Sequence, residues 1–356
     1  MPFNHNFLDI ITFDTCKIFE KPLYYANIQM GGERGNIMKK IGVFCVISIL
    51  LSLLRVDAGD IEKMGIAART KEGQVIKCSP NGGDDTKTLL DGLKLLKEKM
   101  VLHLMPGEYE DSLQSSLDGI IVEGEPGGYC SVDIKLTGKN IIIRNMWCNH
   151  ASTRGDTVIV DSIIGIFQTS WDNNKAQYSF YNCCLHAVML GDYNHKVYLR
   201  NCTIVQNAKD NFCVSMWYGG YVSVEDSIMY SESRCFRLDG NPELHIENSM
   251  VYGALSLAVD DGYSSRTKGT EAVDVKGFKK ICRLKTMGEI IMEKPTFAAK
   301  SKKSVAEVST HGAGISWSTE RDKDLNIFKL EKGSVGEGKN LGANLNEDGF
   351  PVPKTK

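Results

Sequence analysis

The sequence lacks several features that would point to a partner or a cofactor. Its 42 Lys and Arg residues nearly balance its 44 Asp and Glu residues, so no basic field predicts nucleic acid as a partner. No C-x2-C pair occurs, and neither H-x3-H nor H-E-x-x-H is present, which argues against the common zinc motifs. Aromatic residues make up only 8% of the chain. The chain is nevertheless long enough, at 356 residues, to bury a large core.

Long hydrophobic runs are also absent, and the longest run belongs to a segment with the three parts of a secretory signal peptide. Basic residues at 39–40 precede the apolar run 41–54, and a V-x-A ending closes at Ala58. We expect cleavage after Ala58, a true start at Met38, and a non-native or disordered extension at 1–37. The alternative is a membrane anchor formed by uncleaved residues 41–54, although this run is short for a span.

Cysteine is plentiful, but its spacing does not predict a disulfide framework. Eleven Cys residues occur and nine remain after the expected cleavage, so they cannot all be paired. Cys183 and Cys202 follow Asn182 and Asn201 at the same place in two similar phrases. We expect these two thiols to be stacked small side chains in a core, while the disulfide state of the others stays open.

One phrase recurs through the middle of the chain: two apolar residues two apart, then Asn or Asp, then a small or apolar residue. Its anchors are 16 to 25 residues apart, and they are Asn145, Asp161, Asn182, Asn201, Asp226 and Asn248. Each phrase is typical of a short strand bounded by a turn residue. Such repeats indicate a solenoid, because each coil buries its apolar side only against its neighbours. We expect the anchor side chains to form an internal ladder at the turns.

The fold predicted from this period is all-β, a right-handed parallel β-helix with an N-terminal capping α-helix. Leucines at three- and four-residue spacing place that helix at 85–100. The β-helix is expected to be one domain, residues 77–350. Its other predicted parts are an irregular lead-in at 59–76, coils at about 101–262, an irregular excursion at 264–303, C-terminal coils at 304–350 and a loose tail at 351–356.

Three segments carry a resemblance to a known superfamily. They are SPNGGDDTKTLLDGL at 79–93, LHLMPGEYED at 102–111 and GKNLGANL at 338–345. Together with the coils, they resemble the pectate-lyase-like right-handed β-helix proteins that bacteria export. The resemblance implies an architecture and a carbohydrate-related role. The Q-D-T-L and G-R-x-W segments of pectin methylesterases and the N-T-D segment of polygalacturonases are absent, so no specific catalytic family is matched.

A candidate site follows if residues at equal distances from their anchors lie above one another. Asp239 and Asp261 each stand 13 residues after an anchor, so they are predicted to face each other, with Asp260 and Arg237 nearby. Paired carboxylates act as acid and base in glycoside hydrolysis. They also bind Ca²⁺, which would assist a lyase in which a basic group such as Arg237 takes the proton. The alternative is an inert surface ladder.

Aromatic residues late in their coils predict a glycan-binding surface beside this pair. They are Trp171, Tyr193, Trp217 and Tyr218. Such rings stack on sugar faces, and the coil after Asn201 is the longest, so a bulged loop at 216–220 would form one side of a cleft. The alternative is that the rings pack against a neighbouring loop.

The function predicted from the sequence is that of a secreted, periplasmic or cell-surface protein that binds or cleaves polysaccharide. As an enzyme it would be a lyase or a glycosidase on an acidic glycan; the alternative is a non-catalytic glycan-binding or cell-surface protein. We expect a monomer with a polysaccharide partner, no nucleic acid, and no stable membrane insertion after cleavage. Ca²⁺ is the only cofactor that the pattern suggests.

Overall fold

The computed structural model divides the chain into two compact units, residues 1–56 and 57–356. The structure describes residues 58–169, 175–191, 194–206, 212–216, 219–238, 243–256, 283–299 and 324–354, all in the second unit. The predicted signal peptide, apart from Ala58, lies outside these residues.

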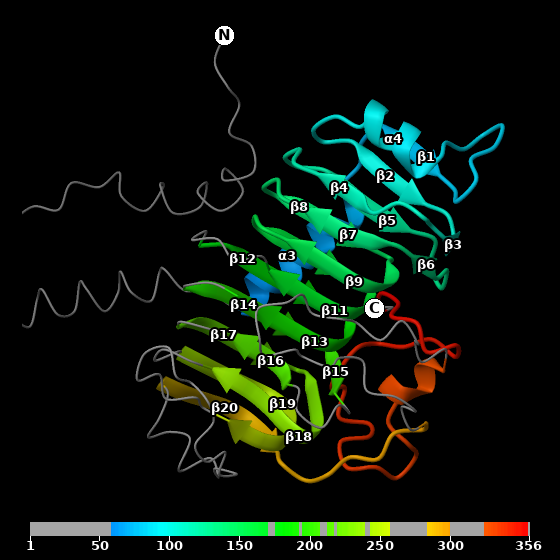
Figure 1. The fold of residues 1–356 in the computed structure, drawn as a ribbon. Helices are drawn as coiled ribbons and strands as arrows, with labels where there is room; N and C mark the ends of the chain where they lie inside the picture. Colours follow the sequence, from blue (N-terminus) through cyan, green and yellow to red (C-terminus); the bar gives the residue numbers. More distant parts are fainter. Residues whose placement is uncertain are drawn as a thin grey trace, which may run out of the picture. The chain divides into compact units, whose positions relative to one another are not determined.

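The strands of the second unit stack as two series of parallel strands, which confirms the predicted parallel β-helix (Figure 1). Sheet 1 contains, in stacking order, β1 (Val75–Cys78), β2 (Val101–Leu104), β5 (Ile121–Gly124), β8 (Ile141–Arg144), β10 (Thr157–Val160), β12 (Gln177–Tyr181), β14 (His195–Arg200), β17 (Gly220–Glu225), β19 (Glu243–Ser256) and β20 (Arg283–Ile291). Sheet 2 contains β4 (Leu113–Ser115), β7 (Asp133–Leu136), β9 (Trp147–Thr153), β11 (Ile163–Thr169), β13 (Cys184–Leu190), β15 (Thr203–Gln206), β16 (Phe212–Met216), β18 (Ile228–Leu238) and the second half of β19. A small third sheet pairs β3 (Gly107–Glu108) with β6 (Cys130–Ser131).

Hydrophobic side chains from both sheets fill the interior of the coils. In β17, Val222 and Val224 are fully buried in this core. Tyr221, Ser223 and Glu225 alternate with them and therefore project from the other face of sheet 1. In this part of sheet 1, one face therefore packs in the core and the other carries polar and aromatic side chains.

Six successive coils turn from sheet 1 into sheet 2 at one residue with left-handed backbone geometry. The six anchors all have positive φ, from 39° at Asn248 to 56° at Asn182. This geometry is costly for most residues, and Asn and Asp tolerate it best. Backbone N–H groups at the turn bond to the next coil, as from Asp161 to the Tyr181 carbonyl at 3.2 Å. The recurrent Asn and Asp are therefore turn residues, and we call these six the corner row.

A row of small buried residues follows the corner row. Cys183 and Cys202 occupy it as predicted, and Ser227 and Ser249 stand at the equivalent places, all 0% exposed. Ser227 Oγ accepts from the Cys202 backbone N–H at 3.0 Å and donates to the Glu225 carbonyl at 2.7 Å. Small side chains are needed here because they satisfy backbone groups inside the turn.

The capping helix is present at the N-terminal end of the stack but is shorter than predicted. α4 (Leu89–Leu95) has 7 residues and occupies only part of 85–100. Thr88 caps it, and its hydroxyl accepts from the Asp91 backbone N–H at 3.2 Å. The backbone leaves helical geometry at the C-cap Leu96, which is extended, and the chain then turns at Lys99, where φ is 64°, to enter β2.

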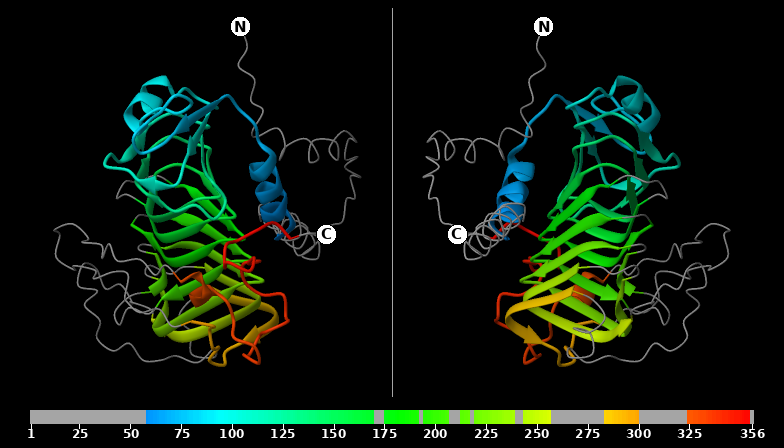
Figure 2. Two further views of the ribbon diagram at one scale, coloured as in Figure 1. Left: turned by 90° about the vertical axis from the view of Figure 1, so that its right-hand side faces the viewer. Right: turned by 90° about the vertical axis from the view of Figure 1, so that its left-hand side faces the viewer.

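The predicted irregular lead-in at 59–76 is wrong, because a helix, α3 (Ala58–Thr70), and the start of β1 occupy it. Both views in Figure 2 show α3 lying alongside the stack. Its buried residues are Ile61, Gly65 and Ala68. A Cβ on Gly65 would lie 2.4 Å from Tyr181 Cδ1, so glycine lets the helix approach the sheet. This glycine interrupts the apolar stripe in the sequence and hides the helical spacing.

Charged side chains attach α3 to sheet 1 and to the corner row. Arg69 donates from Nε and Nη2 to the two carboxylate oxygens of Asp161, at 2.5 and 2.6 Å. Arg144 donates to the carbonyls of Ala68 and Arg69, which a helix end would otherwise leave unpaired. Asn182 also donates to Asp161, at 2.6 Å. These corner side chains thus bind on the outside of the coil, which corrects the predicted internal ladder.

The C-terminal part departs from the prediction in two places. β20 continues sheet 1 within the predicted irregular excursion at 264–303, pairing in parallel with β19. Residues 324–354 lie in the predicted C-terminal coils and tail, but they form a 3-10 helix, η2 (Leu325–Phe328), and a series of turns. Residues 304–323 lie outside the described part of the chain.

This C-terminal segment, residues 324–354, runs back along the corner row. Asn344 donates its backbone N–H to Asn182 Oδ1 at 2.6 Å, and Lys354 Nζ donates to Asn201 Oδ1 at 3.1 Å. Phe328 and Phe350 are buried in an apolar cluster on the outer side of sheet 2. Figure 2 shows the segment, in red, on the same side of the stack as α3. Both chain ends of the unit are therefore bound to the outside of the coils.

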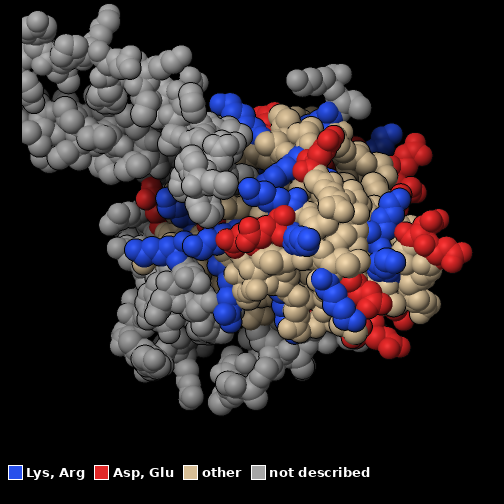
Figure 3. Space-filling model, turned by 90° about the horizontal axis from the view of Figure 1, so that it is seen from above, with Lys and Arg blue, Asp and Glu red and all other residues tan. Residues whose placement is uncertain are grey.

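Positive and negative side chains alternate over the N-terminal end of the stack, as Figure 3 shows. Lys94 and Asp91 of α4 pair there at 2.8 Å. A mixed surface of this kind creates no single-sign field.

We expect Arg69→Ala to lower the free energy of unfolding by about 2 kcal/mol, because it leaves the 2% exposed Asp161 carboxylate without its cation. Urea unfolding followed by circular dichroism measures the change. The matched control is Lys139→Ala at an exposed position of the coils, expected to stay within about 0.5 kcal/mol. Equal effects of the two substitutions would contradict the attachment of α3.

The buried thiols are expected to resist alkylation in the native protein. All eight described cysteines are free and buried, and burial raises the pKa of Cys78 to about 11 and that of Cys130 to about 12. Since the thiolate is the reactive form, iodoacetamide at pH 8 should modify these eight only after denaturant is added. Peptide mass mapping reads each site, and labelling of native Cys183 or Cys202 would contradict their place in the core.

Candidate functional site

Most residues of the predicted site lie outside the described part of the chain. These are Asp239, Asp260, Asp261, Trp171, Tyr193, Trp217 and Tyr218. Their facing arrangement and their roles stay predictions.

Arg237 is the predicted site residue that the structure describes. It lies near the end of β18, and its Cα partners are Ser215 on β16 and Ser256 on β19. Its guanidinium carbon lies 5.8 Å from the centre of the Phe212 ring, a cation–π distance. The side chain is partly buried, so packing against Phe212 accounts for some of its position.

The premise that equal distances from the anchors give equal positions holds in β9, β11 and β13, where Trp147, Ile163 and Cys184 are aligned, but it fails farther along the coils, including the later parts of β18 and β19. Arg237 is eleven residues after its anchor, yet its partner Ser256 is eight residues after Asn248. His195, thirteen residues after its anchor, is 1% exposed and pairs with Gly220 in sheet 1. The pairing of β18 with β19 is irregular between Tyr230 and Phe236. Residues at equal distances from their anchors are therefore no longer aligned after this point.

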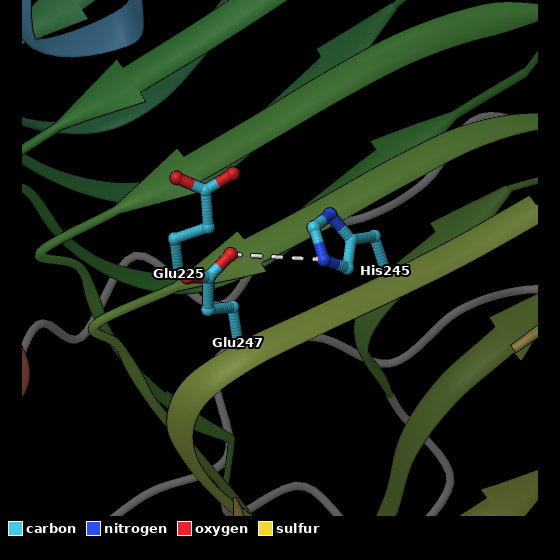
Figure 4. Close-up of side chains that lie close together, drawn as sticks. All are labelled: Glu225, His245 and Glu247. Atoms are coloured by element: carbon cyan, nitrogen blue, oxygen red, sulfur yellow. Dashed lines mark ion pairs between the residues drawn. The ribbon is translucent and has the colours of Figure 1, made fainter. Parts of the chain in front are cut away.

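The structure instead brings together three residues that precede the corner. They are Glu225 at the end of β17, and His245 and Glu247 on β19 (Figure 4). Glu225 and Glu247 are Cα partners in adjacent strands, and each comes directly before a corner residue. His245 lies two residues before Glu247, on the same face of the strand. We call these three side chains the carboxylate–histidine cluster.

The cluster is compact enough for its members to share one ligand. One ligand atom from each residue lies within 4.8 Å of the other two. His245 Nε2 is 3.7 Å from Glu247 Oε2. Ser223 Oγ donates to Glu225 Oε1 at 2.8 Å and so fixes that carboxylate.

Burial is uneven across the cluster and shifts the charge state of its deepest member. Glu225 is 3% exposed, whereas the side chains of His245 and Glu247 are 18% and 27% exposed. Burial raises the pKa of Glu225; the hydrogen bond from Ser223 and the charge of Arg200 oppose this, and Glu247 adds to it. Two carboxylates with different surroundings thus lie side by side in adjacent coils.

The cluster adjoins the place where both ends of the unit meet the coils. Arg200, the Cα partner of Glu225 on β14, pairs with Glu62 of α3 at 3.2 Å and approaches Asp226 at 3.7 Å. Burial lowers the pKa of Lys354, the residue bonded to Asn201. Helix, corner row and C-terminal segment therefore frame one edge of the cluster.

Aromatic residues lie on the same face of sheet 1. The Tyr198 and Tyr221 rings are 5.4 Å apart and tilted by 47°. Tyr198 is buried, while Tyr221 is partly exposed and stands beside the exposed Lys196, its Cα partner. The face thus offers a ring surface, a cation and the cluster within adjacent strands.

The sequence contained a signal for the cluster. Glu225 and Glu247 occupy the same place in two successive phrases, directly before the anchor, where strand register is intact. His245 alternates with the buried Leu244 and Ile246 in β19 and therefore faces outward. Comparison of the residues directly before the anchors, instead of those 13 positions after them, would have predicted that Glu225 and Glu247 are neighbours.

Comparison of the chain with protein-family models, with curated proteins and with solved structures finds no match. No helix among the described residues combines the length and the apolar character that a membrane span requires. The function is therefore inferred from the fold and from the residues of sheet 1.

Proposed function

We propose that the protein is exported and binds an acidic polysaccharide along the outward face of sheet 1. The observation that carries this proposal is the regular pairing of β14, β17 and β19. Outward-facing side chains at paired positions lie above one another in these strands, one strand spacing apart. Partly exposed side chains on this face, among them Tyr221, His245 and Glu247, can contact a linear polymer. The parallel β-helix architecture supports the resemblance to pectate-lyase-like proteins.

The chemistry of this face favours a sugar acid as ligand. Tyr221 provides a partly exposed ring for stacking on a sugar, with its hydroxyl as a polar group. Lys196 places an exposed ammonium group beside that ring, where it would pair with a uronate carboxylate. The proposal requires only that the protein binds the glycan, and a non-catalytic binding protein satisfies it.

Cleavage of the bound glycan is the extended form of this proposal. It assigns acid–base roles to Asp239, Asp260, Asp261 and Arg237, with Ca²⁺ as a candidate cofactor of a lyase. A polyuronate panel with and without Ca²⁺, read by the absorbance of unsaturated ends and by new reducing ends, separates a lyase, a glycosidase and a binding protein.

Tyr221→Ala is expected to weaken polyuronate binding about tenfold, because a stacked aromatic contributes about 1 kcal/mol or slightly more. Lys196→Ala should weaken it and reduce its dependence on salt. Titration calorimetry with polygalacturonate and alginate, with dextran as a neutral control ligand, measures both effects, and Lys139→Ala is the matched exposed lysine. Failure of the folded protein to bind any polyuronate would overturn the proposal.

Export is tested by the fate of the N-terminal segment. The boundary between the two units falls after Val56, two residues before the expected cleavage point, so cleavage would remove only Asp57 and Ala58, the first residue of α3, from the solenoid unit. In a bacterial host we expect a processed protein that begins at Gly59 and lies outside the cytoplasm. Leu50→Arg with Leu51→Arg should abolish processing, since a signal peptide needs an apolar core. Unprocessed protein in the membrane fraction would instead favour the anchor formed by 41–54.

A further inference from the structure

We propose that Glu225, His245 and Glu247 form a binding site for a divalent transition-metal ion, with Zn²⁺ as the best match. This inference does not depend on glycan binding, because it rests on the side chains of the cluster alone.

The positions of the three donors fit a single small ion. Zinc lies about 2.0–2.2 Å from histidine nitrogen and carboxylate oxygen, so two tetrahedral donors are about 3.4 Å apart. His245 Nε2 and Glu247 Oε2 are already 3.7 Å apart, and the third donor lies within 4.8 Å of both. Small side-chain rotations would close the triangle around an ion. The donors also project from adjacent, hydrogen-bonded strands, which hold a site more firmly than a loop does.

An unpaired oxygen on a buried side chain is the second observation that points to a ligand. Glu225 is 3% exposed, and its Oε2 has no hydrogen-bond partner among the described residues. Leaving a polar atom buried without a partner costs free energy, and a bound cation would supply the missing interaction. Arg200, its neighbour in the next strand, reaches toward Glu62 and Asp226.

The mixture of donors selects the class of ion. A nitrogen ligand together with two carboxylates suits Zn²⁺ or a related transition metal, whereas Ca²⁺ prefers oxygen ligands throughout. A divalent ion would also balance the two carboxylate charges. Ser223 bonds to the other oxygen of Glu225 and so acts as the orienting partner that ligating carboxylates have. Three protein ligands leave a position open for water or another ligand.

The test uses the full chain, stripped of metal with a chelator and titrated with ZnCl2 by calorimetry. We expect one equivalent to bind, and millimolar CaCl2 to leave that binding in place. Glu225→Gln and His245→Ala should each weaken binding by more than about 100-fold, and Ser223→Ala by about 10- to 100-fold, the range for loss of an orienting partner. His150→Ala is the matched control, because that histidine pairs with a carboxylate, Asp133, on sheet 2. It should leave the affinity unchanged.

A second measurement keeps the inference testable if Glu225→Gln does not fold. CoCl2 added to the metal-free wild-type protein should give visible d–d bands of a low-coordinate site with nitrogen and oxygen ligands, and His245→Ala should lose them. Circular dichroism confirms that each variant retains its β-sheet signal. Absence of Zn²⁺ binding by the wild-type protein would overturn the proposal. So would binding that persists in His245→Ala, because the ion would then lie elsewhere.

Discussion

The left-handed corner residue in six successive coils is the constraint on which the rest of this structure depends. A parallel β-helix needs a sharp change of direction at the same place in each coil, and only residues that tolerate positive φ permit it. Asn and Asp do so while leaving a polar side chain outside the coil. In five of the six corners the buried residue that follows is Ser or Cys, and its hydroxyl or thiol satisfies backbone groups inside the bend, as at Cys202 and Ser227. Together these two positions keep successive strands of sheet 1 in register up to the corner.

Register before the corner determines what the outer face of sheet 1 can do. The position directly before the corner holds Arg144 in β8 and Tyr181 in β12, and both side chains contact α3. In β17 and β19, nearer the C-terminal end of the stack, the same position holds Glu225 and Glu247, which form the cluster with His245. One structural position therefore serves helix attachment at one end of the stack and a candidate ligand site at the other. The change of residue type along this row separates the two roles.

The repeat predicted the fold because the recurring Asn and Asp are the residues at which the coils turn. All six have the left-handed geometry of a turn. The repeat did not predict the two segments that pack on the outside of the coils, α3 and residues 324–354. α3 was missed because Gly65 breaks its apolar stripe, although that glycine is what allows contact with Tyr181. The C-terminal segment, with Phe328 and Phe350, has no period of its own and takes its shape from the surface on which it packs. The site prediction extended the period past the corner, where irregular residues in β18 shift the register.

The meeting of both chain ends on the corner row has a consequence for how the molecule unfolds. In a solenoid without such contacts, each coil is stabilised only by its neighbours, so the terminal coils can unfold one at a time. Here Glu62 from the start of the unit and Lys354 from its end join Arg200 and Asn201 on the same coil. Opening the terminal coils would break contacts that span nearly the whole unit. These two contacts thus link segments that are far apart in the sequence, and each closes a long loop whose closure costs conformational entropy.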